Sequence, residues 1–164
     1  MKSPAAAFFP AILAGLVPPV YAGGSIVQTL QPLGNTSNYA LIFSWTGDAV
    51  TGAVPAVQAQ LGPGKQGLRI RQVEIVPGSP APAAGYSVQL LDSFGGDLMS
   101  GKLSNLSSTE VQIYAAGAAT PPIMESFSLR IDGQTAAGAH GRVVVYLGPA
   151  NTAASAADSC LPPR

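Results

Sequence analysis

Short apolar runs separated by glycine- and proline-rich turns are the feature that most restricts the fold of this chain. Several runs alternate apolar and polar residues, which is the period of a β-strand with one buried face. No long segment keeps apolar residues at the i, i+3, i+4 and i+7 spacing of an amphipathic helix. Strands between such turns predict an all-β fold, a single β-sandwich or barrel of about seven or eight mainly antiparallel strands. We expect the strands at 26–30, 39–45, 67–76, 86–92, 110–115, 126–132 and 142–147.

Some of these runs allow finer predictions. Residues 39–45 and 142–147 are continuously apolar, which is typical of strands buried on both faces. Within 67–76 the alternation changes phase, and this indicates a β-bulge near Gln72. A helical turn is expected at 97–103. The predicted core consists of Ile42, Phe43, Ile70, Val73, Ile75, Val88, Leu90, Phe127, Leu129, Ile131, Val143 and Val145.

The composition limits the class of protein. With 164 residues the chain is long enough for one domain with its own core. Its formal net charge is +0 and 10% of its residues are charged, whereas a nucleic-acid binder normally needs a basic face. A hydrophobic fraction of 47% argues against a disordered solvating segment. A surface with so little charge is easily buried against neighbours, and we therefore expect assembly.

The N-terminal segment, residues 1–24, has two competing interpretations. Lys2, the apolar stretch 5–20 and the small residue Ala22 form the pattern of a secretory signal peptide cleaved after Ala22. Prolines inside the stretch would interrupt its helix, and an extended arm that docks on a neighbouring subunit is the alternative. The stretch is too short and too broken to span a membrane as a helix. As an arm it would offer Phe8, Phe9, Ile12 and Leu13 as contact residues.

The C-terminal tail, residues 149–164, follows a β-domain expected at 25–148. The tail is small, polar and ends in prolines, and we expect it to be flexible. It contains Cys160, the only cysteine, so an internal disulfide and a C-x-x-C metal cluster are excluded.

His140 is the only histidine and the only residue around which a hydrolytic triad could form. It lies in a glycine-rich turn that enters the last long strand. No serine lies in a G-x-S-x-G motif, which would mark a nucleophile. A structural or solvated histidine is therefore the favoured interpretation.

The loop at 92–97 places Asp92 and Asp97 close together. Paired carboxylates can act as acid and base, and with loop carbonyls they suit Ca²⁺. The loop lacks the denser acidic series of an EF-hand, however, and aspartates among serine and glycine are ordinary turn residues. We assign no catalytic, cofactor-binding or metal-binding residue, and expect no cofactor. Asp92, Phe94 and Asp97 remain candidate contact residues.

Further features are read as surface or core. The glycine-rich stretch 62–67 lacks the spacing of a phosphate-binding loop and is predicted to be a hairpin turn with an exposed lysine. Arg69 and Arg71, with Glu74, form a solvated strand face or pair across a subunit contact. The aromatic side chains are a possible platform for sugars, although Phe43 and Trp45 have the spacing of core residues; the full set is Tyr39, Phe43, Trp45 and Tyr86.

The order of motifs along the chain resembles small proteins encoded beside the structural genes of tailed bacteriophages and prophages. The shared pattern begins with a strand ending in Pro-Gly, a connector with Ala-Pro, and Gly-Tyr or Asn-Tyr leading into an alternating strand. It continues with L-x-D-x-x-G-x-D-x-x-x-G, a Ser/Thr-rich stretch with a Glu, and a final strand that ends in V-x-Y-L. This sequence supplies it at 73–78, Ala81-Pro82, Gly85-Tyr86, 90–98, Gly101, 107–110 and 143–147. The resemblance covers roughly the C-terminal two-thirds of the chain, and it transfers no catalytic residue.

The resemblance implies a non-enzymatic structural component of a virion: an accessory capsid, decoration, head-fibre or head–tail joining protein. Its partners would be copies of itself and other virion proteins, with no nucleic acid and no membrane spanning. The contact elements would be the 1–24 segment and the 92–97 loop. Two alternatives stay open: an exported periplasmic or cell-surface β-sandwich that binds sugar or calcium, and a small hydrolase that uses His140.

Overall fold

The computed structural model describes residues 23–34, 37–117 and 120–149. These residues form eight strands and no helix, which confirms an all-β fold of about eight strands. The strands are β1 (Ser25–Pro32), β2 (Tyr39–Thr46), β3 (Val57–Gln58), β4 (Leu68–Pro77), β5 (Ser87–Leu91), β6 (Gln112–Ala115), β7 (Ser128–Asp132) and β8 (His140–Pro149).

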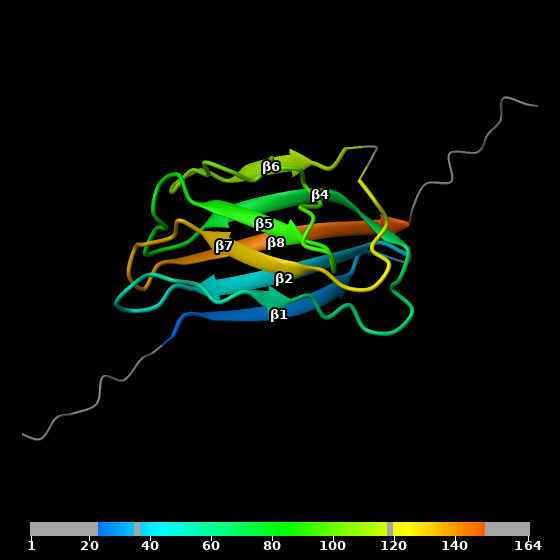
Figure 1. Ribbon diagram of the computed structural model, residues 1–164, viewed down its shortest axis with the longest axis horizontal. Coiled ribbons are helices and arrows are strands. Elements are labelled where there is room, and N and C mark those ends of the chain that lie inside the picture. Colours follow the sequence, from blue (N-terminus) through cyan, green and yellow to red (C-terminus); the bar gives the residue numbers. More distant parts are fainter. Residues whose placement is uncertain (1–22, 35–36, 118–119, 150–164) are drawn as a thin grey trace, which may run out of the picture.

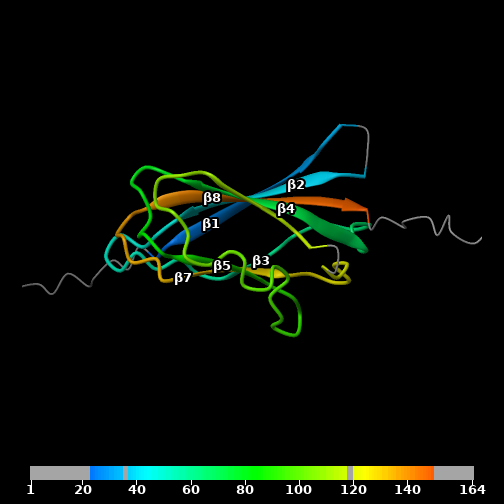
Figure 2. The same cartoon turned by 90° about the horizontal axis from the view of Figure 1, so that it is seen from above.

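The strands form two antiparallel sheets that lie in two layers (Figures 1 and 2). The large sheet has five strands in the order β1-β2-β8-β4-β6, and the small sheet has three in the order β3-β7-β5. The last strand, β8, is therefore the centre of the large sheet, paired with β2 on one side and β4 on the other. The large sheet is open, because β1 and β6 are its edges.

The core lies between the two sheets. Alternate residues of β2 and β8 point from the large sheet toward the small one and are buried. They are Phe43 and Trp45 in β2, and Val143 and Val145 in β8. From the small sheet Leu90 and Leu129 meet them. All the predicted core residues are buried except Ile42, which is partly exposed on the opposite face of β2. Strand β2 is thus not buried on both faces, since no described strand covers the outer side of the large sheet.

The predicted bulge in the fourth strand is confirmed. Pairing of β4 with β8 shifts between Ile70 and Gln72, so that Arg71 is the extra residue. Because of the shift, Ile70 and Val73 both point into the core although they are three positions apart. The phase change in the sequence and the bulge in the strand are the same event.

Other local predictions were wrong. Residues 97–103 form two successive tight turns, closed by hydrogen bonds from Ser100 N to Asp97 O (3.0 Å) and from Lys102 N to Met99 O (3.2 Å). The 62–67 stretch is not a hairpin, because it leads from β3 in the small sheet to β4 in the large one. Strand β3 itself was not predicted, since two residues are too few to show an alternation.

Candidate functional site

The 92–97 loop is a hairpin whose shape depends on its own carboxylates. Asp92 Oδ1 accepts hydrogen bonds from Phe94 N (2.9 Å) and Gly96 N (2.7 Å). The backbone closes the turn between Asp92 N and Gly96 O (2.9 Å), and Leu91 and Asp97 form an isolated β-bridge. These are the contacts of an Asx-turn, in which the side chain replaces a backbone partner.

Asp97 organises the turns that follow the hairpin. Its Oδ1 accepts from Met99 N (3.0 Å) and its Oδ2 from Gly101 N (2.6 Å). Both aspartates line a hollow of ≈ 190 Å³ beside Lys102 and Thr120. Among the described residues no three His, Cys, Asp or Glu side chains lie close enough together to hold a metal ion. The two carboxylates are used mainly to hold backbone, which fits the turn interpretation better than acid–base chemistry.

The tip of this hairpin is apolar and fully open. Phe94 is 96% exposed, and the nearby Met124 is 68% exposed. The two side chains border a hollow of ≈ 200 Å³ together with Leu98, Pro121 and Ile123. The predicted contact residues Asp92, Phe94 and Asp97 thus lie in one loop, whereas Phe8, Phe9, Ile12 and Leu13 lie outside the described residues.

His140 is held as the first residue of β8. Its Nδ1 lies 3.0 Å from Thr46 Oγ1, across the strand pair. Its backbone N donates to Pro80 O (2.9 Å), and its carbonyl accepts from Gly78 N (2.9 Å). No carboxylate hydrogen-bonds to this ring among the described residues. These contacts fit a structural residue at the entry to a strand.

The aromatic side chains do not form an exposed platform. Phe43, Trp45 and Tyr86 are buried in the core. The rings of Trp45 and Tyr86 pack at a centroid distance of 6.1 Å. Tyr39 is partly buried, and its ring and hydroxyl are covered by Lys65, whose Nζ lies 4.2 Å from the ring centroid and donates to the hydroxyl at 2.8 Å. Lys65 is therefore only partly exposed, contrary to the prediction for the 62–67 stretch.

The outer face of the large sheet is the apolar surface that sequence analysis missed. Register alignment places two neighbouring rows across it: Thr29, Ile42, Val144, Glu74 and Ile113 in one, and Val27, Ser44, Arg142 and Val76 in the other. Val27 and Ile113 are 66% and 61% exposed, and Val111, just before β6, is 55% exposed. We name the apolar members of this face the outer patch: Val27, Ile42, Val76, Val111, Ile113 and Val144.

The outer patch could have been suspected at β6. The alternation of Val111 and Ile113 correctly indicated a strand, but it cannot tell which side faces the core. In the structure Tyr114, not Ile113, packs against the core. The patch also borders a hollow of ≈ 450 Å³ that includes Val27, Val76, His140 and Arg142.

The charged residues of β4 have different environments, and the predicted solvated face does not hold for Arg69, whose Nε is buried without a hydrogen-bond partner among the described residues. Glu74 Oε2 accepts a hydrogen bond from Tyr146 Oη (2.8 Å), and this bond raises the pKa of Tyr146 above its ordinary value. Arg71, the bulge residue, donates to the carbonyl of Pro149. Arg71 therefore serves the end of β8, while Glu74 stands in the outer rows beside Val144.

No family model, curated protein or solved structure matches this chain. The described residues also contain no helix that is long and apolar enough to cross a membrane.

Proposed function

We propose that this protein is a non-enzymatic structural subunit, built as a β-sandwich, that works by binding copies of itself and other proteins of a phage particle. The observation that carries the proposal is the outer patch, an apolar stripe across the exposed face of the large sheet. Exposed contiguous apolar surface on a folded domain marks an interaction site. The hairpin tip at Phe94 adds a separate apolar contact point on another side of the molecule, for other proteins of the particle and not for a second copy.

The polar residues support binding over catalysis. The Asp92 and Asp97 carboxylates accept backbone N–H groups, and His140 lies against Thr46. A general base needs a free position toward substrate and an orienting partner. The virion setting has a separate support, which is the order of motifs from Val73 to Leu147 that resembles phage structural proteins.

The test is the intact mass of the natively produced protein together with its size by light scattering. A full-length chain in an oligomer, or bound to a particle, is the expected result. A monomer in solution and no association with particles would contradict the proposal.

An exported binding module is the second candidate, and one observation favours it. Strand β1 begins at Ser25, separated by two residues from the segment that cleavage after Ala22 would remove, so that this cleavage would leave all the described strands complete. The same mass measurement separates the two candidates. A monomeric chain that begins at Gly23 would support export and a binding role outside the cytoplasm.

A further inference from the structure

We infer that the outer face of the large sheet is a two-fold contact between two copies of this chain, centred on Arg142 and Glu74. The inference deepens the proposed function and rests on it, because it names the surface and the partner through which a structural subunit assembles. An isologous contact of this kind uses the same patch on both copies.

The outer face carries more exposed apolar side chains than a solvated sheet face normally does. The residues that a solvated sheet face normally carries are polar, so that apolar and polar residues alternate inward and outward. Here Val27, Val111 and Ile113 point outward at both edges of the sheet, and Val76 and Ile42 lie between them, partly buried by their neighbours. In Figure 2 the small sheet covers only one side of the large sheet. No described strand covers the other side, where Val27, Val111 and Ile113 are exposed, whereas Val144 is only 8% exposed.

The area of the outer face is close to what a dimer contact needs. Five strands at a spacing of about 4.8 Å, over about eight residues at 3.3 Å each, give a face of roughly 600 Å². A stable interface of standard size takes about 800 Å² from each partner. The outer face thus supplies most of what one partner needs.

The outer rows carry one positive and one negative side chain, which can pair across a two-fold axis. Arg142 in β8 and Glu74 in β4 are the charged residues of the two outer rows, and they lie on adjacent strands in adjacent rows. A two-fold axis placed between them brings each Arg142 to Glu74 of the second copy. The contact then contains two equivalent ion pairs within apolar surroundings, each supported by the Tyr146 hydroxyl on Glu74. A formal net charge of +0 leaves little repulsion between whole copies.

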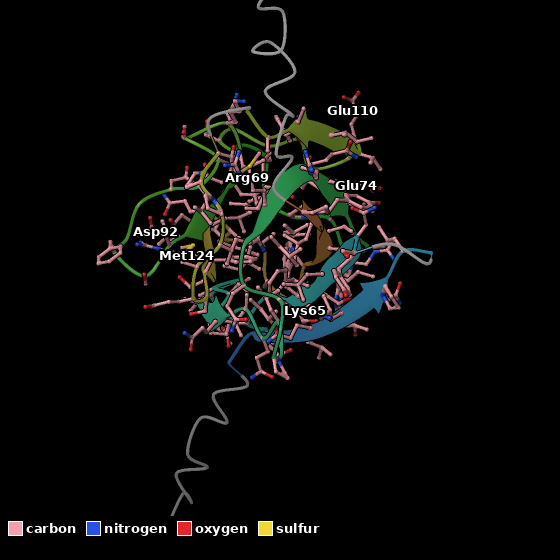
Figure 3. The ribbon with its side chains drawn as sticks, turned by 90° about the vertical axis from the view of Figure 1, so that its right-hand side faces the viewer. Lys65, Arg69, Glu74, Asp92, Glu110 and Met124 are labelled. Atoms are coloured by element: carbon pink, nitrogen blue, oxygen red, sulfur yellow. The ribbon has the colours of Figure 1, made fainter. Side chains whose placement is uncertain are left out.

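The 92–97 hairpin lies on the other side of the molecule. Figure 3 shows Glu74 on the side of the large sheet, while Asp92 and Met124 lie on the opposite side. A contact through the outer face therefore leaves the hairpin free. It also provides matched control positions: Phe94 for an exposed apolar side chain, and Arg130, 56% exposed in β7, for an arginine.

The experiment measures self-association of the full-length chain by sedimentation equilibrium. The variants are Arg142→Glu, Glu74→Arg and the double charge reversal. Each single reversal places like charges opposite each other across the axis, and we expect it to weaken dimerisation at least about tenfold. The double reversal restores the opposite charges and should return the dissociation constant to within about threefold of the original chain. Ile113→Ser should also weaken the dimer, whereas Phe94→Ser and Arg130→Glu should not.

Circular dichroism and thermal unfolding show whether each variant is folded, and the double reversal supplies an internal check, because a misfolded single variant would not be rescued. Two results would overturn the sheet contact. In one, both single charge reversals and Ile113→Ser leave the dimer unchanged; in the other, Phe94→Ser abolishes the dimer. Either result would still be compatible with a structural function. A chain that is monomeric but dimerises when residues 1–22 are removed would also overturn it, since its own N-terminal segment would then be the occupant. A chain that neither dimerises nor joins a particle would remove the proposed function as well.

Discussion

Both faces of the large sheet carry valine and isoleucine, but these side chains have opposite environments on the two faces. On the inner face Val73 and Ile75 of β4, and Val143 of β8, pack against the small sheet and are inaccessible to solvent. On the outer face Val27 and Ile113 stand open to solvent. Burial between the sheets explains why the inner residues are apolar. Folding gives no comparable reason for the outer ones, and this difference separates residues that stabilise the domain from residues available to a partner.

The largest expected difference between the two faces is the loss of stability when one isoleucine on each face is replaced by alanine. Ile75→Ala leaves a cavity in the core and should lower the free energy of unfolding by about 2–5 kcal/mol. Ile113→Ala removes exposed surface and should change it by less than about 0.5 kcal/mol. Urea denaturation in dilute solution, where association does not contribute, measures both. Equal losses for the two variants would mean that the outer face is part of the folding core.

A methyl group added to the inner face should have the next largest effect. A Cβ at Gly141 would lie 2.5 Å from Trp45 Cζ2, which is buried beneath it. Gly141→Ala forces the indole to move and should cost about 1–3 kcal/mol. Because Trp45 is the only tryptophan, its fluorescence emission reports the shift directly. Gly23→Ala, where a Cβ would meet nothing within 4 Å, is the control. An unchanged emission spectrum and stability in Gly141→Ala would show that the ring is not packed there.

Removal of the buried hydroxyl of Tyr86 should raise the stability of the fold, whereas the previous substitutions should lower it. Tyr86 Oη has no hydrogen-bond partner among the described residues, and burial, with a smaller contribution from the Tyr114 phenol, raises the pKa of Tyr86 from 10.0 to about 12. Tyr86→Phe removes the unpaired group and should increase the free energy of unfolding by about 1 kcal/mol at neutral pH.

The pH dependence of stability follows from the same group. The pKa of Tyr86 is higher in the folded state than in the unfolded state. Ionisation of this phenol therefore leaves the free energy of unfolding unchanged below pH 10.0 and lowers it as the pH rises to about 12. Tyr86→Phe should flatten that loss in denaturant titrations across this window. Tyr39→Phe is the matched control, because the Tyr39 hydroxyl accepts a hydrogen bond from Lys65 and its removal should not stabilise the fold. A Tyr86→Phe variant less stable than the original chain would contradict the assignment of an unpaired hydroxyl.

Sequence pattern predicts the local elements of this fold well. The alternation of Val88 and Leu90, and the phase change near Gln72, each correspond to a strand or a bulge in the structure. Strand alternation and the bulge are set by residues that are adjacent in the sequence, and a local sequence pattern can therefore predict them. The turn chemistry of Asp92 and Asp97 was predictable for the same reason.

Sequence pattern does not predict how the strands are arranged or what the outer face does. Strand β8, the last of the described strands, pairs with β2, whose Thr46 is 94 positions before His140, and no local period records a pairing over such a separation. The outer patch exists only once five strands lie in register, because its residues come from segments far apart in the chain. Alternation at Val111 and Ile113 shows that one side of β6 is apolar, but the neighbouring sheet decides that this side faces solvent.

The smallest expected effect concerns a polar pair on the outer face. Tyr146 Oη donates to Glu74 Oε2 at 2.8 Å in a partly exposed position, and Tyr146→Phe should lower the free energy of unfolding by only about 0.5 kcal/mol. The hydrogen bond raises the pKa of Tyr146. Its stabilising effect on the fold is therefore complete below the ordinary pKa of tyrosine and is lost as the pH rises through the raised pKa of Tyr146.

Titration of tyrosinate absorbance, compared between the original chain and Tyr146→Phe, should assign a late-ionising phenol to Tyr146. Glu74→Gln should move that ionisation to lower pH, because the largest cause of the shift is the bond to the Glu74 carboxylate. A dilute sample keeps the chain monomeric and reports folding alone. If Tyr146→Phe lowered the free energy of unfolding by several kcal/mol, this polar pair would belong to the folding core. The outer face would then stabilise the domain as the inner face does.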